Sequence, residues 1–176
     1  MRIGFGIDVH AFDGSKGSSP SSRPLILGGV HVQYERGLVG HSDADVLTHA
    51  VMDALLSAAR LDDIGKHFPP TDPAYKDANS LELLQHVKTL LVGEGWEVED
   101  LDCVMIAEEP RLSPYRDEMR ANIAGVLGIA ISQVGIKATT SEHLGFEGRG
   151  EGISAYAVAL LVRSRGDSYD NPYSDL

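Results

Sequence analysis

The spacing of hydrophobic residues changes between the first two structural segments of this chain. Over residues 1–12 every second position is apolar, which is typical of a β-strand. Over residues 46–58 apolar residues recur at intervals of three and four, which is typical of one helix face. Because an apolar strand face and an apolar helix face each need a covering layer, the two patterns predict a fold of sheet and helices. The strand set is Ile3, Phe5, Ile7 and Val9.

The other elements follow from residue spacing and from capping residues. Ser42 and Asp43 are N-cap candidates for a helix that runs to about residue 59. Asn79 and Ser113 are N-cap candidates for two further helices, and Gly28-Gly29 suggests a bulge or turn. We predict strands at 25–32, 96–106, 134–140 and 153–162, and helices ending near 59, 92 and 128. The pattern predicts an α+β fold whose helices pack on one face of the sheet.

The chain has 176 residues, which fits one domain. We assign residues 1–163 to that domain and residues 164–176 to a polar, flexible tail. Residues 13–24, rich in glycine, serine and proline, form a loop that we expect to be dispensable. Residues 60–78 form a long ordered loop, and such loops in small domains are usually functional.

Charge and composition exclude several classes of partner. A net charge of -11 disfavours a nucleic-acid partner, because phosphates attract a basic face. No apolar run approaches the ~20 residues that span a bilayer, and the N-terminus lacks the pattern of a leader peptide. Cys103 has no second cysteine to pair with, so we expect a cytoplasmic, reducing compartment. The alternative role of Cys103 as a nucleophile lacks an activating neighbour in the sequence.

Two segments offer ligands for a metal ion. Asp8 and His10 stand two positions apart on a strand, so both side chains point to the same face. Asp45, His49 and Asp53 form one stripe of the first helix. If His49 meets Asp8 and His10, the site has two histidines, one carboxylate and an open position for substrate, as in catalytic zinc sites. The alternatives are a strand-end hydrogen bond for the pair and an exposed helix position for His49.

Polar residues also gather at the start of the first helix, over residues 41–45. Capping would explain Ser42 or Asp43 but not His41 or Asp45. The free N–H groups of a helix start would suit an anion.

Three later segments could bind a phosphorylated ligand. Residues 139–142 supply three hydroxyls and the carboxylate of Glu142, which near phosphate would need Mg²⁺ or Mn²⁺ between them. The glycine-rich residues 145–152, with Arg149, either surround phosphate with N–H groups or form a flexible hairpin. Residues 107–114 could present backbone groups to a base edge. The alternative for residues 139–142 is an ordinary polar strand end. For residues 107–114 an ordinary connection between a strand and a helix explains the sequence equally well.

Together these segments resemble the 2-C-methyl-D-erythritol 2,4-cyclodiphosphate synthases of the non-mevalonate isoprenoid pathway. The resemblance covers residues 2–162, and several blocks in the same order make it specific. The strongest blocks are RIGFGIDVHAF, HSDADVLTHAVMDALL, DIGKHFPPTD and KATTSEHLGFEGRGEGI.

The resemblance implies a lyase that forms a homotrimer, with sheets facing the centre and active sites between subunits. Its implied substrate is 4-diphosphocytidyl-2-C-methyl-D-erythritol 2-phosphate, whose 2-phosphate attacks the β-phosphate and expels CMP. The implied products are this CMP and 2-C-methyl-D-erythritol 2,4-cyclodiphosphate. Divalent cations would neutralise and align the diphosphate, so the protein needs no nucleophile of its own.

Residue roles carry over by position. The implied ligands of Zn²⁺, or of another divalent cation, are Asp8, His10 and His49. Glu142 would hold Mg²⁺ or Mn²⁺ with the diphosphate, and His41 and Thr140 would stabilise the transition state. The implied substrate contacts are Asp8, His10, His41, Ser42, Asp63, Ile64, Gly65, Phe68, Pro69, Pro70, Thr71, Asp72, Ala107, Glu108, Glu109, Pro110, Arg111, Leu112, Ser113, Thr139, Thr140, Ser141, Glu142, Phe146 and Arg149.

This chain departs from the family pattern at a few positions. It has Pro70 where aspartate is common, and Tyr156 near where an acidic partner of Arg149 is expected. The other departures are Glu108, Glu109, Arg111 and Ser141. Two rival functions remain at this level. The first is a metal-dependent phosphohydrolase, and the second is a non-catalytic trimer that binds a metal ion or an isoprenoid phosphate.

Overall fold

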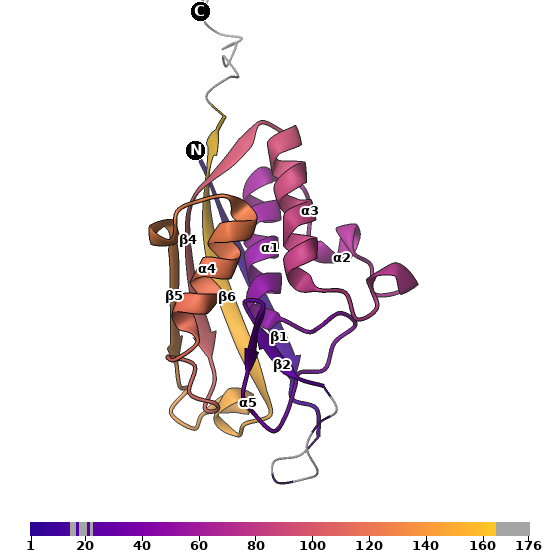
Figure 1. The fold of residues 1–176 in the computed structure, drawn as a ribbon, viewed down its shortest axis with the longest axis vertical. Helices are drawn as coiled ribbons and strands as arrows, with labels where there is room; N and C mark the ends of the chain where they lie inside the picture. The colour runs from indigo at the N-terminus through magenta and orange to yellow at the C-terminus, as the bar shows by residue number, and fades with distance from the viewer. Residues whose placement is uncertain (15–16, 18–20, 22, 165–176) are drawn as a thin grey trace, which may run out of the picture.

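A four-stranded sheet forms one layer of the fold (Figure 1). We describe it from a computed structural model that covers residues 1–14, 17, 21 and 23–164. The strand order is β1-β6-β4-β5, with β1 at Arg2–Ala11, β4 at Trp96–Ile106, β5 at Val134–Thr139 and β6 at Gly152–Arg163. Strands β4 and β5 run parallel, whereas β6 is antiparallel to both β1 and β4. Strands β1 and β4 therefore end at the same end of the sheet.

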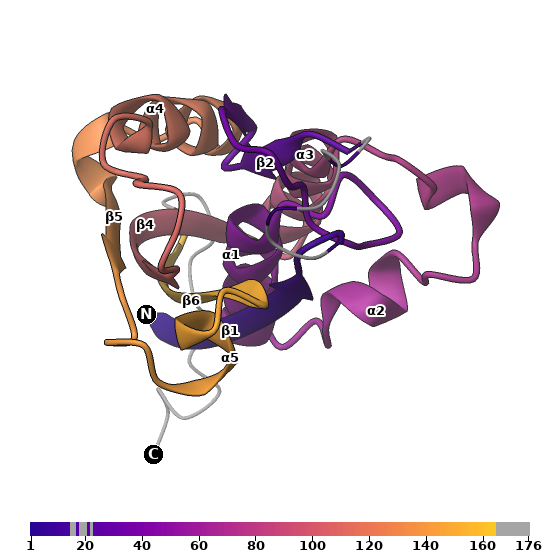
Figure 2. The ribbon, with the colours of Figure 1, turned by 90° about the horizontal axis from the view of Figure 1, so that it is seen from below.

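Helices α1 (Val46–Ala59), α3 (Ser80–Gly93) and α4 (Arg116–Leu127) gather on one side of the sheet, as Figure 2 shows. The short helices α2 (Ile64–His67) and η1 (Pro73–Tyr75) order the segment between α1 and α3. Helix α5 (Gly145–Gly148) and the turn η2 (Ile131–Gln133) flank β5. This arrangement confirms the predicted α+β fold. Over the part of the chain that the structure describes, no helix is long and apolar enough to cross a membrane.

Three predicted boundaries are wrong. The segment 25–32 is a hairpin of β2 (Leu25–Leu27) and β3 (Val30–Val32), turned by Gly28 and Gly29 at positive φ. Helix α1 is capped by Asp45, whose side chain accepts from the N–H group of Thr48, and not by Ser42 or Asp43. Helix α4 follows Tyr115, with no side-chain cap from Ser113.

The glycines of β1 bring α1 against the strand backbone. A methyl group at Gly4 would lie 1.9 Å from the carbonyl oxygen of Ala54, and one at Gly6 would lie 2.2 Å from that of Ala50. Only glycine allows such contact between helix and strand backbones. The apolar side chains of β1 therefore occupy the other face of the sheet, where they stay exposed among the residues that the structure describes. Their exposed fractions are 66% for Ile3, 54% for Phe5, 46% for Ile7 and 48% for Val9.

The predicted flexible tail lies almost wholly outside the described residues, and the predicted dispensable loop lies half outside them. The tail after residue 163 is described only at Ser164, whose N–H group donates to the carbonyl oxygen of Gly95. Within residues 13–24 the structure describes positions 13, 14, 17, 21, 23 and 24. The flexibility and dispensability of these segments remain predictions.

Candidate active site

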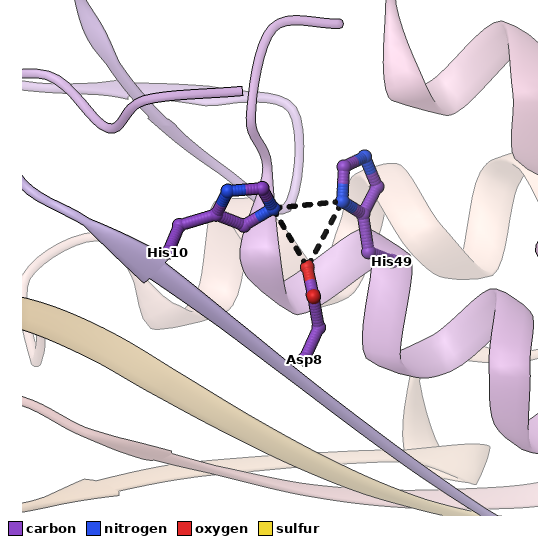
Figure 3. Close-up of side chains that lie close together, drawn as sticks. All are labelled: Asp8, His10 and His49. Carbon is purple, nitrogen blue, oxygen red and sulfur yellow. Dashed lines mark hydrogen bonds and ion pairs between the residues drawn. The ribbon is translucent and has the colours of Figure 1, made fainter. Parts of the chain in front are cut away.

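Asp8, His10 and His49 point their side chains at one another (Figure 3). The carboxylate Oδ2 of Asp8 lies 2.9 Å from Nε2 of His10 and 3.0 Å from Nδ1 of His49. The two ring nitrogens are 3.2 Å apart. These are the three residues that the i, i+2 pattern and the resemblance predict. Among the residues that the structure describes, they form the one group of histidines, cysteines and carboxylates that converges in this way.

Strand β1 and helix α1 supply this group from opposite sides. Asp8 and His10 project from the same face of β1, and the glycines of that face bring α1 and His49 within reach. Burial opposes ionisation of Asp8, but its hydrogen bonds to both histidines and their positive charge hold its pKa well below the usual range. Burial lowers the pKa of His10, but the hydrogen bond and charge of Asp8 outweigh this and raise it.

The hydrogen bonds of the rings test whether the group fits a cation. Nδ1 of His10 lies 2.6 Å from the carbonyl oxygen of Val39, which can only accept, so this nitrogen carries the proton. In the neutral ring the lone pair of Nε2 then faces Asp8. When the proton of His49 is on Nε2, two imidazole nitrogens and a carboxylate oxygen converge with no hydrogen between them, and a cation can occupy the point where they meet. The donor set suits a divalent cation such as Zn²⁺.

A cavity of about 270 Å³ lies beside this group. Its walls include His41, Ser42, Ile64, Gly65, Phe68 and Pro70, which are predicted substrate contacts, and also Tyr75 and Leu83, which the sequence does not indicate. Nε2 of His41 lies 3.1 Å from the carbonyl oxygen of Asp72. Asp63 is not in this wall; its side chain caps α2 by accepting from the N–H group of Lys66. Pro69 and Thr71 are not in the wall either.

A second cavity, of about 390 Å³, lies between the ends of β4 and β5 and the start of α4. The predicted residues in its walls are Ala107, Glu108, Pro110, Arg111, Leu112, Ser113, Thr139 and Thr140. The structure adds two basic residues to these walls, Lys137 and Arg116, which the sequence analysis missed. Basic residues close to a phosphate-binding segment could have indicated them. Glu109 is outside these walls and accepts from the hydroxyl of Tyr34 at 3.3 Å.

Glu108 organises the turn that follows β5. Its Oε1 accepts from the N–H groups of Ser141 and His143 at 3.0 and 3.1 Å and from the hydroxyl of Ser141 at 3.2 Å. The hydrogen bond from the N–H group of His143 has the largest effect on the pKa of Glu108. Together with the bonds from Ser141 it holds this pKa below its usual value, although burial opposes the shift. Glu142 and His143 both have positive φ, so the turn needs such an anchor. Within the turn, the hydroxyl of Thr140 donates to Oε1 of Glu142 at 2.7 Å.

The glycine-rich segment is not an open hairpin, and part of its N–H groups are bonded within the segment. It forms α5, and the N–H groups of residues 148–151 donate to carbonyl oxygens of residues 144–147 at 2.9–3.2 Å. Arg149 pairs with both carboxylate oxygens of Glu151 at 2.8 and 2.9 Å. Tyr156 stands near the position where family members often have an acidic partner of Arg149, and in this chain Glu151, two residues from Arg149, is that partner. Phe146 is half-buried in α5.

The two carboxylates that share the helix stripe of His49 have other partners. Asp45 is buried and accepts from the N–H groups of Gly28, Gly29 and Thr48, so it joins the β2–β3 turn to α1. It also occupies the helix start that the sequence assigned to an anion. Asp53 accepts from the N–H group of Ile64 at 2.9 Å and so joins α1 to α2.

The two cavities lie at opposite edges of the sheet. The first borders β1, the second borders β4 and β5, and β6 stands between them. Three strand spacings separate the edges by about 14 Å. Glu142 is accordingly not part of the Asp8, His10 and His49 group within one chain.

The fold and these features define a small α+β protein with a carboxylate–histidine cation site and a separate polar cavity. The chain belongs to the YgbB family, whose family model matches residues 1–162. Curated relatives called 2-C-methyl-D-erythritol 2,4-cyclodiphosphate synthase include one from Geobacillus kaustophilus, 56% identical over 93% of this chain and 99% of its own. Another, from Geotalea uraniireducens, is 55% identical over the same shares.

Solved structures agree with the fold. The bifunctional IspDF from Campylobacter jejuni matches with a TM-score of 0.85 and 40% identity, over 92% of this chain and 42% of that one. A CDP complex of IspF from Plasmodium falciparum matches with a TM-score of 0.79 and 31% identity, over 93% of this chain and 96% of that one.

Proposed function

We propose that this protein converts 4-diphosphocytidyl-2-C-methyl-D-erythritol 2-phosphate to 2-C-methyl-D-erythritol 2,4-cyclodiphosphate and CMP. The observation that carries the proposal is the convergence of Asp8, His10 and His49 on one point beside a cavity, in a chain of this family. In the reaction an oxygen of the 2-phosphate forms a bond to the β-phosphorus. The bond from that phosphorus to the oxygen shared with the α-phosphate breaks, and this oxygen leaves on CMP.

The protein contributes positioning and electrostatics. Zn²⁺ or another divalent cation on Asp8, His10 and His49, and Mg²⁺ or Mn²⁺ on Glu142, would reduce the repulsion between the phosphates. His41 and Ser42 lie in the cavity wall beside the first site and would contact the methylerythritol phosphate. Thr140 lies in the second cavity, whose backbone and cationic walls suit a cytidine nucleotide.

We propose that three copies assemble head to tail and that each active site forms between two of them. Two observations support this. The cation cavity and the nucleotide cavity lie at opposite edges of one sheet, so a neighbour could bring them together. The uncovered sheet face also carries the exposed apolar side chains of β1 and that of Val158, which would be buried if the sheets face the trimer centre.

The direct test is to incubate purified protein with the substrate, Zn²⁺ and Mg²⁺ in ¹⁸O-labelled water. We expect CMP and a cyclic diphosphate without the label. A linear product that carries the label would instead indicate a phosphohydrolase, and no CMP release under any cation condition would indicate a binding protein.

The assembly has its own test. His49→Ala and Thr140→Val should each inactivate the homotrimer, because every site then carries one defective half. Co-expressed chains should recover roughly a quarter of wild-type activity, from head-to-tail contacts that pair two intact halves. Mixed trimers confirmed by mass spectrometry that stay inactive would contradict a shared site.

A further inference from the structure

The outer nitrogen of His49 faces two buried hydroxyls. Nε2 of His49 lies 3.0 Å from Oγ of Ser80, the first residue of α3, and 3.1 Å from Oγ of Ser42. Nδ1 of the same ring faces Asp8 and His10. Ser80 is fully buried, and only 8% of His49 is exposed. Solvent therefore has little access to the partners that set the tautomer of this ring.

The Ser80 hydroxyl has its only proton committed to Asp43. Oδ1 of Asp43 accepts a short hydrogen bond from Oγ of Ser80, and Oδ2 accepts from the N–H group of Ser80 at 2.9 Å. A serine hydroxyl has one proton to donate, so towards His49 it can only accept. A hydrogen bond between Ser80 and the ring therefore needs a proton on Nε2 of His49, which in the neutral ring leaves the lone pair on Nδ1, facing the cation site. In this arrangement the hydroxyl of Ser42 accepts from the same nitrogen.

We propose that Asp43 and Ser80 are positioning residues for His49, joined in a relay from carboxylate to hydroxyl to imidazole. The relay selects the tautomer that can bind a cation through Nδ1 and holds the ring in the plane that meets Asp8 and His10. Metal-binding histidines commonly donate their second N–H group to a carboxylate. Here a serine hydroxyl stands between the ring and the carboxylate, and α3 is thereby joined to the cation site.

The relay also fixes the loop before α1. Oδ1 of Asp43 accepts from the N–H group of Asp45 at 3.2 Å, and the N–H group of Asp43 donates to the carbonyl oxygen of Ala78 at 3.1 Å. The carboxylate is thus held from two directions. The position of the Asp43 carboxylate depends on both α3 and the loop 41–45. A displacement of either element would therefore rotate the imidazole ring of His49.

The inference rests on the proposed cation site, so Zn²⁺ affinity is the quantity to measure. We would titrate metal-free protein with Zn²⁺ in competition with a chromophoric chelator at pH 7.5. Ser80→Ala should weaken Zn²⁺ binding by about 10- to 100-fold. Asp43→Asn, which keeps the size and one acceptor, should weaken it by a smaller factor. The double variant should lose no more than Ser80→Ala alone, because one relay is being removed.

The matched control is Thr48→Val. Thr48 is fully buried, adjoins His49 and donates its hydroxyl to Oδ2 of Asp45 at 2.8 Å, but the structure gives it no bond to the ring. The metal-free control should lose stability while Zn²⁺ affinity stays within about twofold of wild type. A second readout is ¹⁵N NMR of the metal-free protein, in which His49 should be the Nε2–H tautomer and should lose that preference in Ser80→Ala.

The outcomes separate the two proposals. If wild-type protein does not bind Zn²⁺, the cation site itself fails, and the relay with it. If wild type binds Zn²⁺ and releases CMP but both relay variants bind Zn²⁺ as tightly as Thr48→Val, the relay alone is overturned. If Ser80→Ala does not fold, Asp43→Asn and the tautomer of wild-type His49 decide the question.

Discussion

Replacing Gly6 by alanine tests how the strand and the helix build the cation site. The added methyl group would lie 2.2 Å from the carbonyl oxygen of Ala50 and 2.5 Å from the nitrogen of Ala54. Ordinary van der Waals contact begins at 3.4 Å. Both neighbouring atoms belong to the backbone of α1, so no side chain can turn away. The helix must move from the strand by about 1 Å, because packed interiors have no free space to absorb the overlap.

That displacement has two measurable consequences. Overpacking of this kind costs about 1–3 kcal/mol, and a loss of about 2 kcal/mol would lower the Tm of a chain of this size by roughly 4–8 °C. His49 directly precedes Ala50, and metal–ligand distances tolerate only about ±0.2 Å. Gly6→Ala should therefore also weaken Zn²⁺ binding by about tenfold or more. Thermal unfolding of the metal-free protein and chelator competition measure the two effects separately.

Gly125→Ala is the matched control. Gly125 lies inside α4, and a methyl group there would meet nothing within 4 Å. Alanine should raise stability by about 0.5–1 kcal/mol through helix propensity and leave Zn²⁺ affinity unchanged. If Gly6→Ala unfolds at the wild-type temperature and binds Zn²⁺ as tightly, α1 does not rest on the backbone of β1 and the reasoning is wrong.

Further expectations concern Glu108, Cys103 and the loop 13–24. Glu108→Ala should weaken CDP binding measured by calorimetry, whereas Glu108→Gln, which keeps an acceptor, should weaken it less; an equal loss in both would count against the anchoring role. Because the pKa of Glu108 is lowered in the folded state, its stabilising effect is present above its ordinary value of 4.5 and is lost as the pH falls through the lowered value, so wild type and Glu108→Gln should converge in stability in acid. Burial raises the pKa of Cys103 to about 12, so iodoacetamide at pH 8 should modify it only after unfolding, and rapid modification of the native protein would refute this. Shortening residues 13–24 should leave activity intact, and an inactive variant that still folds and binds Zn²⁺ would show that the loop has a role.

The sequence predicts most elements well because their periodicity is local. Strand β4 has the predicted bounds of 96–106, and β1 and β6 differ by one or two residues at their ends. The errors fall where a polar side chain has a distant partner. Ser42 and Asp43 suit a helix cap by type, but in the fold they meet His49 and Ser80, seven and 37 residues away. A capping rule that considers only neighbouring residues cannot detect that a distant partner takes up the side chain.

The candidate site shows the same division between local and long-range information. Strand geometry predicts that Asp8 and His10 point to the same face. The prediction that His49 joins them depended on the family resemblance. Ser80 could not be found, because nothing in a residue at a helix start indicates contact with a ring 31 positions earlier. The basic residue Lys137 could have been found, since it stands two positions before Thr139 on a strand and therefore shares a face with the start of the nucleotide segment.

The pattern of β1 could have predicted more than the alternation of its apolar residues suggests. Alternation gives each strand two faces, and here the glycine face packs on the helix while the face with large side chains stays uncovered. Two glycines at alternate positions permit an approach that no other residue allows, and this approach brings His49 to Asp8 and His10. The large residues cannot share that face, so they must point the other way, where one chain has no layer to cover them. Formation of the cation site and exposure of the apolar face on which we propose that a partner packs are therefore two consequences of a single alternation.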